Sequence, residues 1–292
     1  MYSKKYSILY FIFSLVLFSA CEKDAENVDI PLVQPQLAVH SYISPQAENI
    51  VVWVGISKPI FGASNNGSAY IDDAIVKISD GVTMKDVPYN VMYNNYRLDT
   101  NSFKIIPGKT YTLYVSSPNG KNAKATCTVP MPPDANSFTA DFDTTVKRTA
   151  TELDYRLNVR LKWHDIPGQA DYYHTFAEVK LVNYPDTGFW SYALIADELV
   201  SDKTRDGEVL SGINSQYSVS HFNSGGLNFY NNPEGIKYHL FRVDENYYKY
   251  HLSSQNNNSG DPFSEPVTMH NNIENGLGCF GAYYQVSDSL DF

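Results

Sequence analysis

Hydrophobic and polar residues alternate along most of the chain beyond residue 36, in short segments separated by Pro, Gly and Asn. This pattern predicts β-strands that each bury one face, with turns between them. The first half should contain strands at residues 37–43, 50–56 and 74–79, followed by a hairpin of residues 105–115 and 123–129. We therefore expect residues 36–130 to form an immunoglobulin-like β-sandwich of about seven strands.

Two local signals in this half identify particular turns. Asp80-Gly81 is predicted to close the third strand. Tyr111 follows the turn Pro107-Gly108, and immunoglobulin-like sandwiches often place a tyrosine there whose hydroxyl ties its strand to the preceding corner.

A proline-rich segment, residues 130–133, interrupts the pattern and marks the predicted domain boundary. Beyond it, residues 153–163 alternate strictly, residues 165–168 make a turn and residues 171–181 form a returning strand. The second domain, residues 131–292, should be mostly β, either as a second sandwich or as an extension of the first sheet. One short helix is predicted, capped by Asp244 and ending within residues 256–260, with an apolar stripe formed by Tyr247, Tyr248, His251 and Leu252.

Composition narrows the possible functions. The chain carries 22 basic and 32 acidic residues, a net charge of −10, which disfavours nucleic acid or an anionic lipid surface as a partner. Hydrophobic residues make up 43% and aromatic residues 14%, so the chain is expected to fold rather than stay disordered.

The first 21 residues have the pattern of an export signal. Lys4 and Lys5 precede an uncharged apolar run, residues 6–20, that is shorter than the roughly 20 residues of a membrane-spanning helix. The run ends in small residues before Cys21, which resembles a bacterial lipobox. The resemblance implies a signal peptide at residues 1–20, diacylglycerol and an amide-linked acyl chain such as palmitate on Cys21, and a tether at residues 21–35. An ordinary secretory signal is the alternative.

Acidic residues follow this cysteine directly, at Glu22, Asp24 and Glu26. They resemble the surface-export signals of Bacteroidetes lipoproteins, which implies an outer-membrane location facing the cell exterior. A solvated tether with no export role is the alternative.

The last forty-odd residues carry the most specific motif. Residues 247–250, 261–266 and 271–283 resemble the C-terminal signature of the DUF4249 family of Bacteroidetes outer-membrane lipoproteins. The family's activity is unknown, and its usual proximity to TonB-dependent transporters implies an accessory or substrate-capturing role. No catalytic residue is implied.

The motif itself is predicted to be structural. Its glycines should let the backbone bend while Ile273, Leu277 and Phe280 enter a core and Asn271 or Asn272 satisfies backbone amides. The structural residues are Asn271, Gly276, Gly278, Phe280 and Gly281. Cys127 and Cys279 are expected to remain unpaired, because they lie in different predicted domains.

The sequence lacks the common catalytic and metal-binding motifs. The histidines lack the spacing of a zinc-binding helix, and Gly276-x-Gly278-x-x-Gly281 lacks the following helix of a dinucleotide site. Asp202, Asp206 and Glu208 do not alternate as a calcium loop requires, so no metal and no cofactor is expected. Aromatic residues in loop-rich stretches are candidates for a sugar- or peptide-binding surface: Tyr93, Tyr96, Trp190, Tyr192, Tyr217, Phe222 and Tyr230.

The sequence therefore favours a non-catalytic lipoprotein that assists a TonB-dependent transporter. A surface sugar- or peptide-binding protein that works alone is the first alternative. An enzyme, whose carboxylates would meet only in the fold, is the second.

Overall fold

The computed structural model describes residues 34–58, 70–148, 152–184, 190–222, 230–257 and 268–292. The predicted signal peptide, Cys21 and most of the tether lie outside these residues. Within them the fold is mainly β with one α-helix, as predicted. No helix among the described residues is long and apolar enough to cross a membrane.

The elements of the first half are β1 (Leu37–Ile43), β2 (Asn49–Ile56), β3 (Ile75–Ser79), β4 (Met84–Asp86), β5 (Tyr89–Asn90), β6 (Asn95–Asp99), β7 (Thr110–Ser116) and β8 (Asn122–Thr128). The second half contains a short 3-10 helix, η1 (Ala135–Ser137), then β9 (Thr139–Arg148), β10 (Glu152–His164), β11 (Tyr172–Tyr184), β12 (Trp190–Ser201), β13 (Val209–Ser211), β14 (Ser215–Phe222), β15 (Tyr230–Val243), α2 (Glu245–Asn257) and β16 (Gly276–Asp291).

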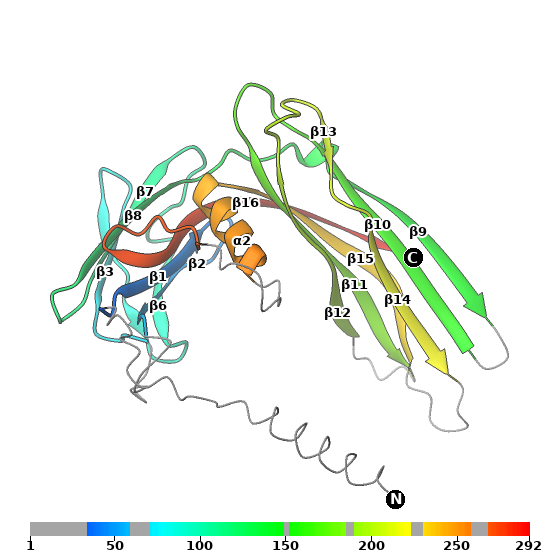
Figure 1. Ribbon diagram of the computed structural model, residues 1–292, viewed down its shortest axis with the longest axis horizontal. Helices are drawn as coiled ribbons and strands as arrows, with labels where there is room; N and C mark the ends of the chain where they lie inside the picture. The colour runs from blue at the N-terminus through cyan, green and yellow to red at the C-terminus, as the bar shows by residue number, and fades with distance from the viewer. Residues whose placement is uncertain (1–33, 59–69, 149–151, 185–189, 223–229, 258–267) are drawn as a thin grey trace, which may run out of the picture. The chain divides into compact units, whose positions relative to one another are not determined.

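The strands form three sheets (Figure 1). An eight-stranded sheet runs in the order β12-β11-β15-β16-β1-β2-β6-β5, and a four-stranded sheet runs β4-β3-β7-β8. The third sheet has β10 at its centre, paired with β9 along one edge and with β13 and β14 along the other. Among the described strand pairs, β1 with β16 is parallel and the others are antiparallel.

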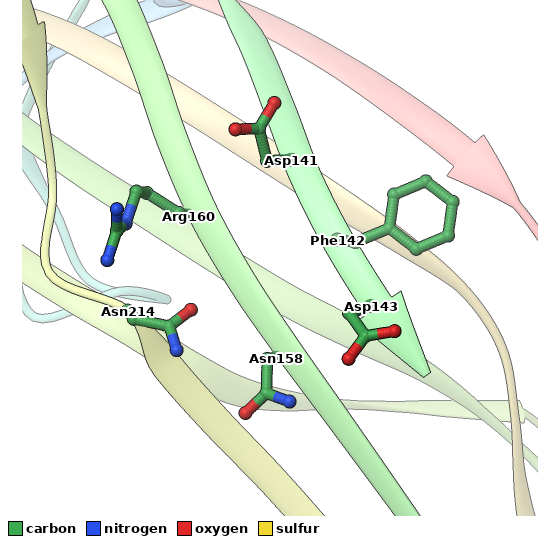
Figure 2. Close-up of a pocket in the computed structure, with 6 residues that line it drawn as sticks. All are labelled: Asp141, Phe142, Asp143, Asn158, Arg160 and Asn214. Carbon is green, nitrogen blue, oxygen red and sulfur yellow. The ribbon is translucent and has the colours of Figure 1, made fainter. Parts of the chain in front are cut away.

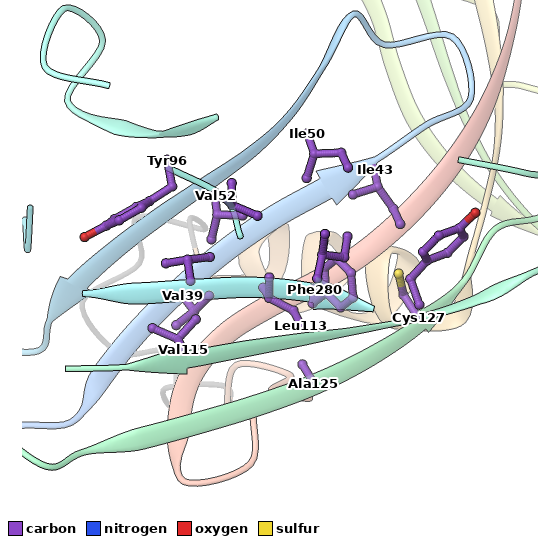
Figure 3. Packing of buried hydrophobic residues seen from close by; sticks show 14 of the residues in the cluster. Val39, Ile43, Ile50, Val52, Tyr96, Leu113, Val115, Ala125, Cys127 and Phe280 are labelled. Carbon is purple, nitrogen blue, oxygen red and sulfur yellow. The ribbon is translucent and has the colours of Figure 1, made fainter. Parts of the chain in front are cut away.

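The first sandwich buries alternate side chains of two facing sheets (Figure 3). Val39 and Phe280 from the eight-stranded sheet pack with side chains of β7 and β8. Those side chains are Leu113, Val115 and Cys127, and all five residues are at most 3% exposed. Period-two burial is the property that the sequence pattern predicted. The predicted sandwich is therefore confirmed, although the described residues between 36 and 130 form eight strands rather than about seven.

The predicted tyrosine corner is also present. The Tyr111 hydroxyl donates to the Lys104 carbonyl (2.9 Å) and accepts from the Ile106 amide (2.8 Å). The turn before it closes through the Lys109 amide and the Ile106 carbonyl, with Gly108 at φ +77°. Pro107 and Gly108 suit this turn because a type II turn favours proline at its first central position and needs a positive φ at its second central position.

The second half realises both alternatives left open by the sequence. Leu157, Val159, Leu161 and Trp163 are the buried face of β10, and they share a core with β11 and β15. This core is a second sandwich, and β11, β12 and β15 also extend the first sheet. Residues 165–168 do not close a hairpin, because β10 and β11 belong to different sheets; they form a corner between the two layers.

Strand β16 connects the two sandwiches. Its residues 276–282 pair with β1, and its residues 283–291 pair with β15. Ile273, Phe280 and Ala282, which lie far beyond the boundary predicted after residue 130, are buried in the first core. The end of the chain therefore completes the sandwich with which the described chain begins.

Candidate functional site

The segment from Asn271 to Gly281, here called the C-terminal clasp, uses two asparagine side chains to hold its own backbone. Asn272 donates from Nδ2 to the Phe280 carbonyl (2.8 Å), and its Oδ1 accepts from the Phe280 amide (3.0 Å). Its Nδ2 also contacts the Thr126 carbonyl of β8 (3.2 Å). Asn271 donates to the Gly276 carbonyl (2.8 Å) and accepts from the Ile273 amide (3.1 Å). Both amides thus replace missing sheet partners.

The glycines of the clasp lie where β16 approaches its neighbours closely. Gly278 has φ +118°, and a Cβ there would overlap the Val39 carbonyl oxygen of β1. A Cβ at Gly276 would lie 2.8 Å from the Leu37 carbonyl oxygen, and one at Gly281 would lie 3.0 Å from Tyr247 Cβ. A side chain at Gly278 would therefore meet both a strained backbone and a clash.

The apolar residues of the clasp differ in burial. Ile273 and Phe280 are 4% and 0% exposed and enter the first core. Leu277, expected in a core, is 40% exposed. Leu277 lies on the face opposite Phe280, because neighbouring strand residues point to opposite sides. The prediction that Leu277 enters a core was therefore wrong. Helix α2 contacts the same face further along the strand, where the Asn246 carbonyl accepts from the Cys279 thiol and Tyr247 lies beside Gly281.

Asp244 joins α2 to β16. Its Oδ1 accepts from the amide of Tyr247 (3.0 Å), which is the predicted N-cap, and from the amide of Ala282 (3.1 Å). Its own amide donates to the Ala282 carbonyl (2.9 Å). Burial raises the pKa of Asp244 to about 7, against the opposing effect of the two amide donors.

Histidines and tyrosines pack beneath the helix. His174 is 4% exposed, with Nδ1 hydrogen-bonded to the Tyr247 hydroxyl (3.0 Å) and Nε2 to Asp197 Oδ1 (2.6 Å). The His251 ring lies 4.3 Å from that of Tyr247, and burial lowers the pKa of His251 to about 4. Among the described residues no serine, threonine or cysteine bonds to His174. Through the Tyr247 hydroxyl, the His174–Asp197 pair anchors α2 on β11.

A polar pocket lies on the outer surface of the third sheet (Figure 2). Its volume is about 340 Å³, and it is lined by Asp141, Phe142, Asp143, Asn158, Arg160 and Asn214. Asp141 pairs across the ladder with Arg160, and Asp143 with Asn158, so these four side chains share one face. Phe142 points away from them and packs on Phe292, with ring centroids 5.4 Å apart. Carboxylate, guanidinium and amide groups side by side can hydrogen-bond a polar ligand.

This pocket was not predicted. Its residues come from β9, β10 and the loop before β14, and only the register of the ladder brings them together. Strict alternation in residues 153–163 identified the polar face but gave no indication of its partner strand.

The four aromatic residues with described side chains, of the seven considered for a ligand surface, do not form a cluster. Tyr96 is 2% exposed, and its hydroxyl donates to the Ile71 carbonyl (3.0 Å) and accepts from the Ala74 amide (2.8 Å). Tyr217 packs against the second core, whereas Tyr93, in the turn between β5 and β6, and Tyr192, on β12, are 53% and 42% exposed. The side chains of Trp190, Phe222 and Tyr230 lie outside the described part of the chain.

The acidic residues that the sequence places around Gly207 are only partly brought together. Asp202 and Asp206 form a cluster with Asp165 rather than with Glu208. Asp165 lies in the turn after β10, and no local sequence signal joins it to a loop nearly forty residues later.

Residues 24–289 match the family model described as "Domain of unknown function (DUF4249)". The chain belongs to the DUF4249 family. A search of curated proteins gives no match.

The signature that suggested DUF4249 is therefore engaged in packing along the described part of the motif. Cys279, within it, is fully buried, and its thiol donates to the Asn246 carbonyl (3.6 Å). Cys127 and Cys279 are both free thiols, as predicted, and burial raises the pKa of each. Neither thiol is exposed to act as a nucleophile.

Replacing Phe280 by alanine should lower the free energy of unfolding by about 3–5 kcal/mol, because a fully buried aromatic ring leaves a cavity. Leu277→Ala is the matched control in the same strand and should cost about 1 kcal/mol or less. Gly278→Val should prevent the β1–β16 pairing and give little folded protein. Urea denaturation followed by circular dichroism measures all three; equal costs at residues 277 and 280 would contradict the packing described.

Asp244→Asn should change how stability depends on pH. A raised folded-state pKa means that the folded protein keeps a proton that the unfolded chain releases near pH 4, so the stabilisation is lost as pH rises toward about 7. Asparagine retains the cap but does not titrate. Between about pH 4.5 and pH 7.5, the variant should lose less stability than the wild type. Urea midpoints at the two pH values measure this.

His251 changes the pH dependence of stability in the opposite direction. The pKa of His251 is lowered, so its contribution is lost as pH falls from about 6.5 toward 4. The difference between wild type and Asp244→Asn cancels this contribution, because both proteins retain His251. Parallel pH profiles of the two proteins would contradict a raised pKa at Asp244.

Proposed function

We propose that the mature protein begins at Cys21, is held in the outer membrane by lipid on that cysteine, and serves as a non-catalytic accessory or substrate-capturing partner of a TonB-dependent transporter. The lipobox-like end of the export signal supports the anchor. The acidic residues after Cys21 support exposure on the cell exterior. All of these residues lie outside the described part of the chain.

One observation carries the non-catalytic part of the proposal. The polar side chains of the C-terminal clasp, Asn271 and Asn272, bond to backbone groups on β16, β8 and the clasp itself. Catalytic groups must instead be directed at a substrate. The residues most specific to the DUF4249 signature thus favour a scaffold, and a scaffold acts through its surfaces.

An ordered turn with exposed apolar side chains favours a protein partner. Val91 and Met92, in the turn between β5 and β6, are 80% and 82% exposed. Asn90 Oδ1 accepts from the amides of Met92 (3.0 Å) and Tyr93 (3.3 Å), and the Arg97 guanidinium lies 3.9 Å from the Tyr93 ring. These contacts fix the turn with its apolar side chains in solvent. Exposed apolar side chains on a rigid turn are favourable for docking, because binding needs little further ordering.

Cys21→Ala should abolish membrane retention. Two or more acyl chains give stable anchoring, whereas a chain without lipid has no anchor of this kind. Metabolic labelling with a fatty acid and fractionation of cells measure the effect, with Cys279→Ala as the control that leaves Cys21 intact. A Cys21→Ala protein that stays labelled and membrane-bound would disprove the lipoprotein assignment.

Val91→Asp combined with Met92→Asp should weaken capture of the transporter at least tenfold while leaving the melting temperature within about 1 °C, because both side chains are already exposed. Cross-linking in cells, followed by mass spectrometry of the captured membrane protein, is the measurement. Val82→Asp is the matched control, since Val82 is 91% exposed in the turn between β3 and β4. Unchanged capture by the double variant would remove this turn from the interface.

The pocket on β9 and β10 favours a second candidate, a surface sugar- or peptide-binding protein that works without a transporter. Arg160 and Asn214 offer donors on one side of it, and Asp141 and Asp143 offer acceptors. This function requires the purified protein to bind a sugar or peptide alone and to lose binding in Arg160→Ala. Binding that appears only with the transporter present would exclude it.

A further inference from the structure

Three carboxylates meet where two loops of the second sandwich touch. Asp165 follows β10, while Asp202 and Asp206 lie in the loop between β12 and β13. One oxygen from each carboxylate lies within 4.8 Å of an oxygen of the other two. Asp165 and Asp202 are 5% and 2% exposed, and Asp206 is exposed. The cluster is thus buried on one side and open to solvent on the other.

Hydrogen bonds fix two of the three carboxylates. Asp165 accepts from the Tyr173 hydroxyl (2.7 Å) and from the Gly207 amide (2.8 Å). Asp206 accepts from the Gly168 amide (2.8 Å). These bonds link the loops across the two sheets, because Asp165 and Gly168 come from one loop and Asp206 and Gly207 from the other.

Within the described residues, no basic side chain balances the cluster. Arg242 is close by, but it is engaged by Asp171, whose Oδ2 lies 2.6 Å from its Nη2. No ion pair of 4.0 Å or less joins a described lysine or arginine to Asp165, Asp202 or Asp206. Three like charges at this separation are unfavourable unless a proton or a cation is shared among them.

Asp202 supplies an observation independent of the clustering. Its Oδ2 is buried and has no hydrogen-bond partner among the described residues. A buried carboxylate oxygen without a partner costs free energy. Burial and the charges of Asp165 and Asp206 also raise the pKa of Asp202. The same carboxylate contributes an oxygen to the cluster, so Asp202 brings a buried acceptor without a protein partner to this place.

The geometry selects the class of cation. Three oxygens no more than 4.8 Å apart can all lie within about 2.8 Å of one centre. Calcium binds oxygen at about 2.3–2.6 Å with flexible geometry, so a small closure of the loop completes such a site. Magnesium needs about 2.0–2.1 Å and an octahedral arrangement. Carboxylate ligands also disfavour metals that prefer nitrogen or sulfur.

We propose that Asp165, Asp202 and Asp206 bind a calcium ion that fastens the β12–β13 loop to the corner after β10. Water or loop carbonyl groups complete the coordination on the open side, beside Asp206. The spacing rule for a single calcium loop misses this site, because its ligands come from two loops. The ion joins the two sheets of the second sandwich, and this structural role is independent of the function proposed above.

The test compares thermal unfolding of the full chain, purified in detergent, in EDTA and in calcium chloride. Extracellular calcium sites bind with dissociation constants of about 10⁻⁴–10⁻³ M, so about 10 mM calcium should raise the melting temperature by about 2–6 °C. Magnesium at the same concentration should give less than half of this rise. Asp202→Asn and Asp206→Asn should show no calcium-dependent rise, whereas Glu208→Gln, an exposed change in the same loop, should respond as the wild type does.

Two results would overturn the proposal. One is a wild-type melting temperature that does not rise with calcium, including the case in which acidification alone stabilises the protein, because the cluster would then share a proton. The other is an equal rise in Asp206→Asn and wild type, because calcium would then act elsewhere. Asp206 is exposed, so its variant is expected to fold even if Asp202→Asn does not.

Discussion

The parallel pairing of β1 with β16 is the constraint on which the rest of the structure depends. Leu37 pairs with Gly276, so nearly the whole described chain must fold back before this ladder closes. Closing so long a loop costs conformational entropy before its contacts form. Short-range contacts hold β16 against β1. Gly278 lets the strand lie against the Val39 carbonyl, Asn272 hydrogen-bonds to the Phe280 backbone, and the Phe280 ring is buried in the first core.

Because β16 serves both sandwiches, neither is complete without it. Without residues 273–282, the first core would lose Ile273, Phe280 and Ala282, and β1 would lose a partner. The second sandwich uses the other half of the same strand, where Tyr238 pairs with Asp288 across the ladder and donates to its carboxylate (3.0 Å). Asp244 then fixes α2 at the point where the two halves meet. The linker after residue 130 therefore separates two cores but not two independent structures.

Sequence reasoning succeeded where a feature is specified by residues close together in the chain. The corner at Pro107, Gly108 and Tyr111, the cap at Asp244 and the alternation in β10 each depend on a few neighbouring residues, and each was predicted. It failed where burial or chemistry depends on a distant partner. Tyr96 was considered for a ligand surface but lies in the first core, with its hydroxyl hydrogen-bonded to the backbone of residues 71 and 74. Leu277 lies in the same motif as Phe280 yet faces outward, and Asp165 meets Asp202 only after two sheets have packed.

The distribution of polar groups separates the scaffold from the surfaces that can act on other molecules. Around the clasp, asparagine and aspartate side chains point at backbone amides and carbonyls, and the histidine beneath α2 has both ring nitrogens engaged. On the outer face of the third sheet, in contrast, Asp143 of β9, Arg160 of β10 and Asn214 of the loop before β14 face solvent around a pocket. A buried polar group that loses its partner is costly, whereas an exposed one can change partner freely. The DUF4249 signature thus lies largely on the shared strand, and the recognition function proposed above would depend on exposed residues outside that signature.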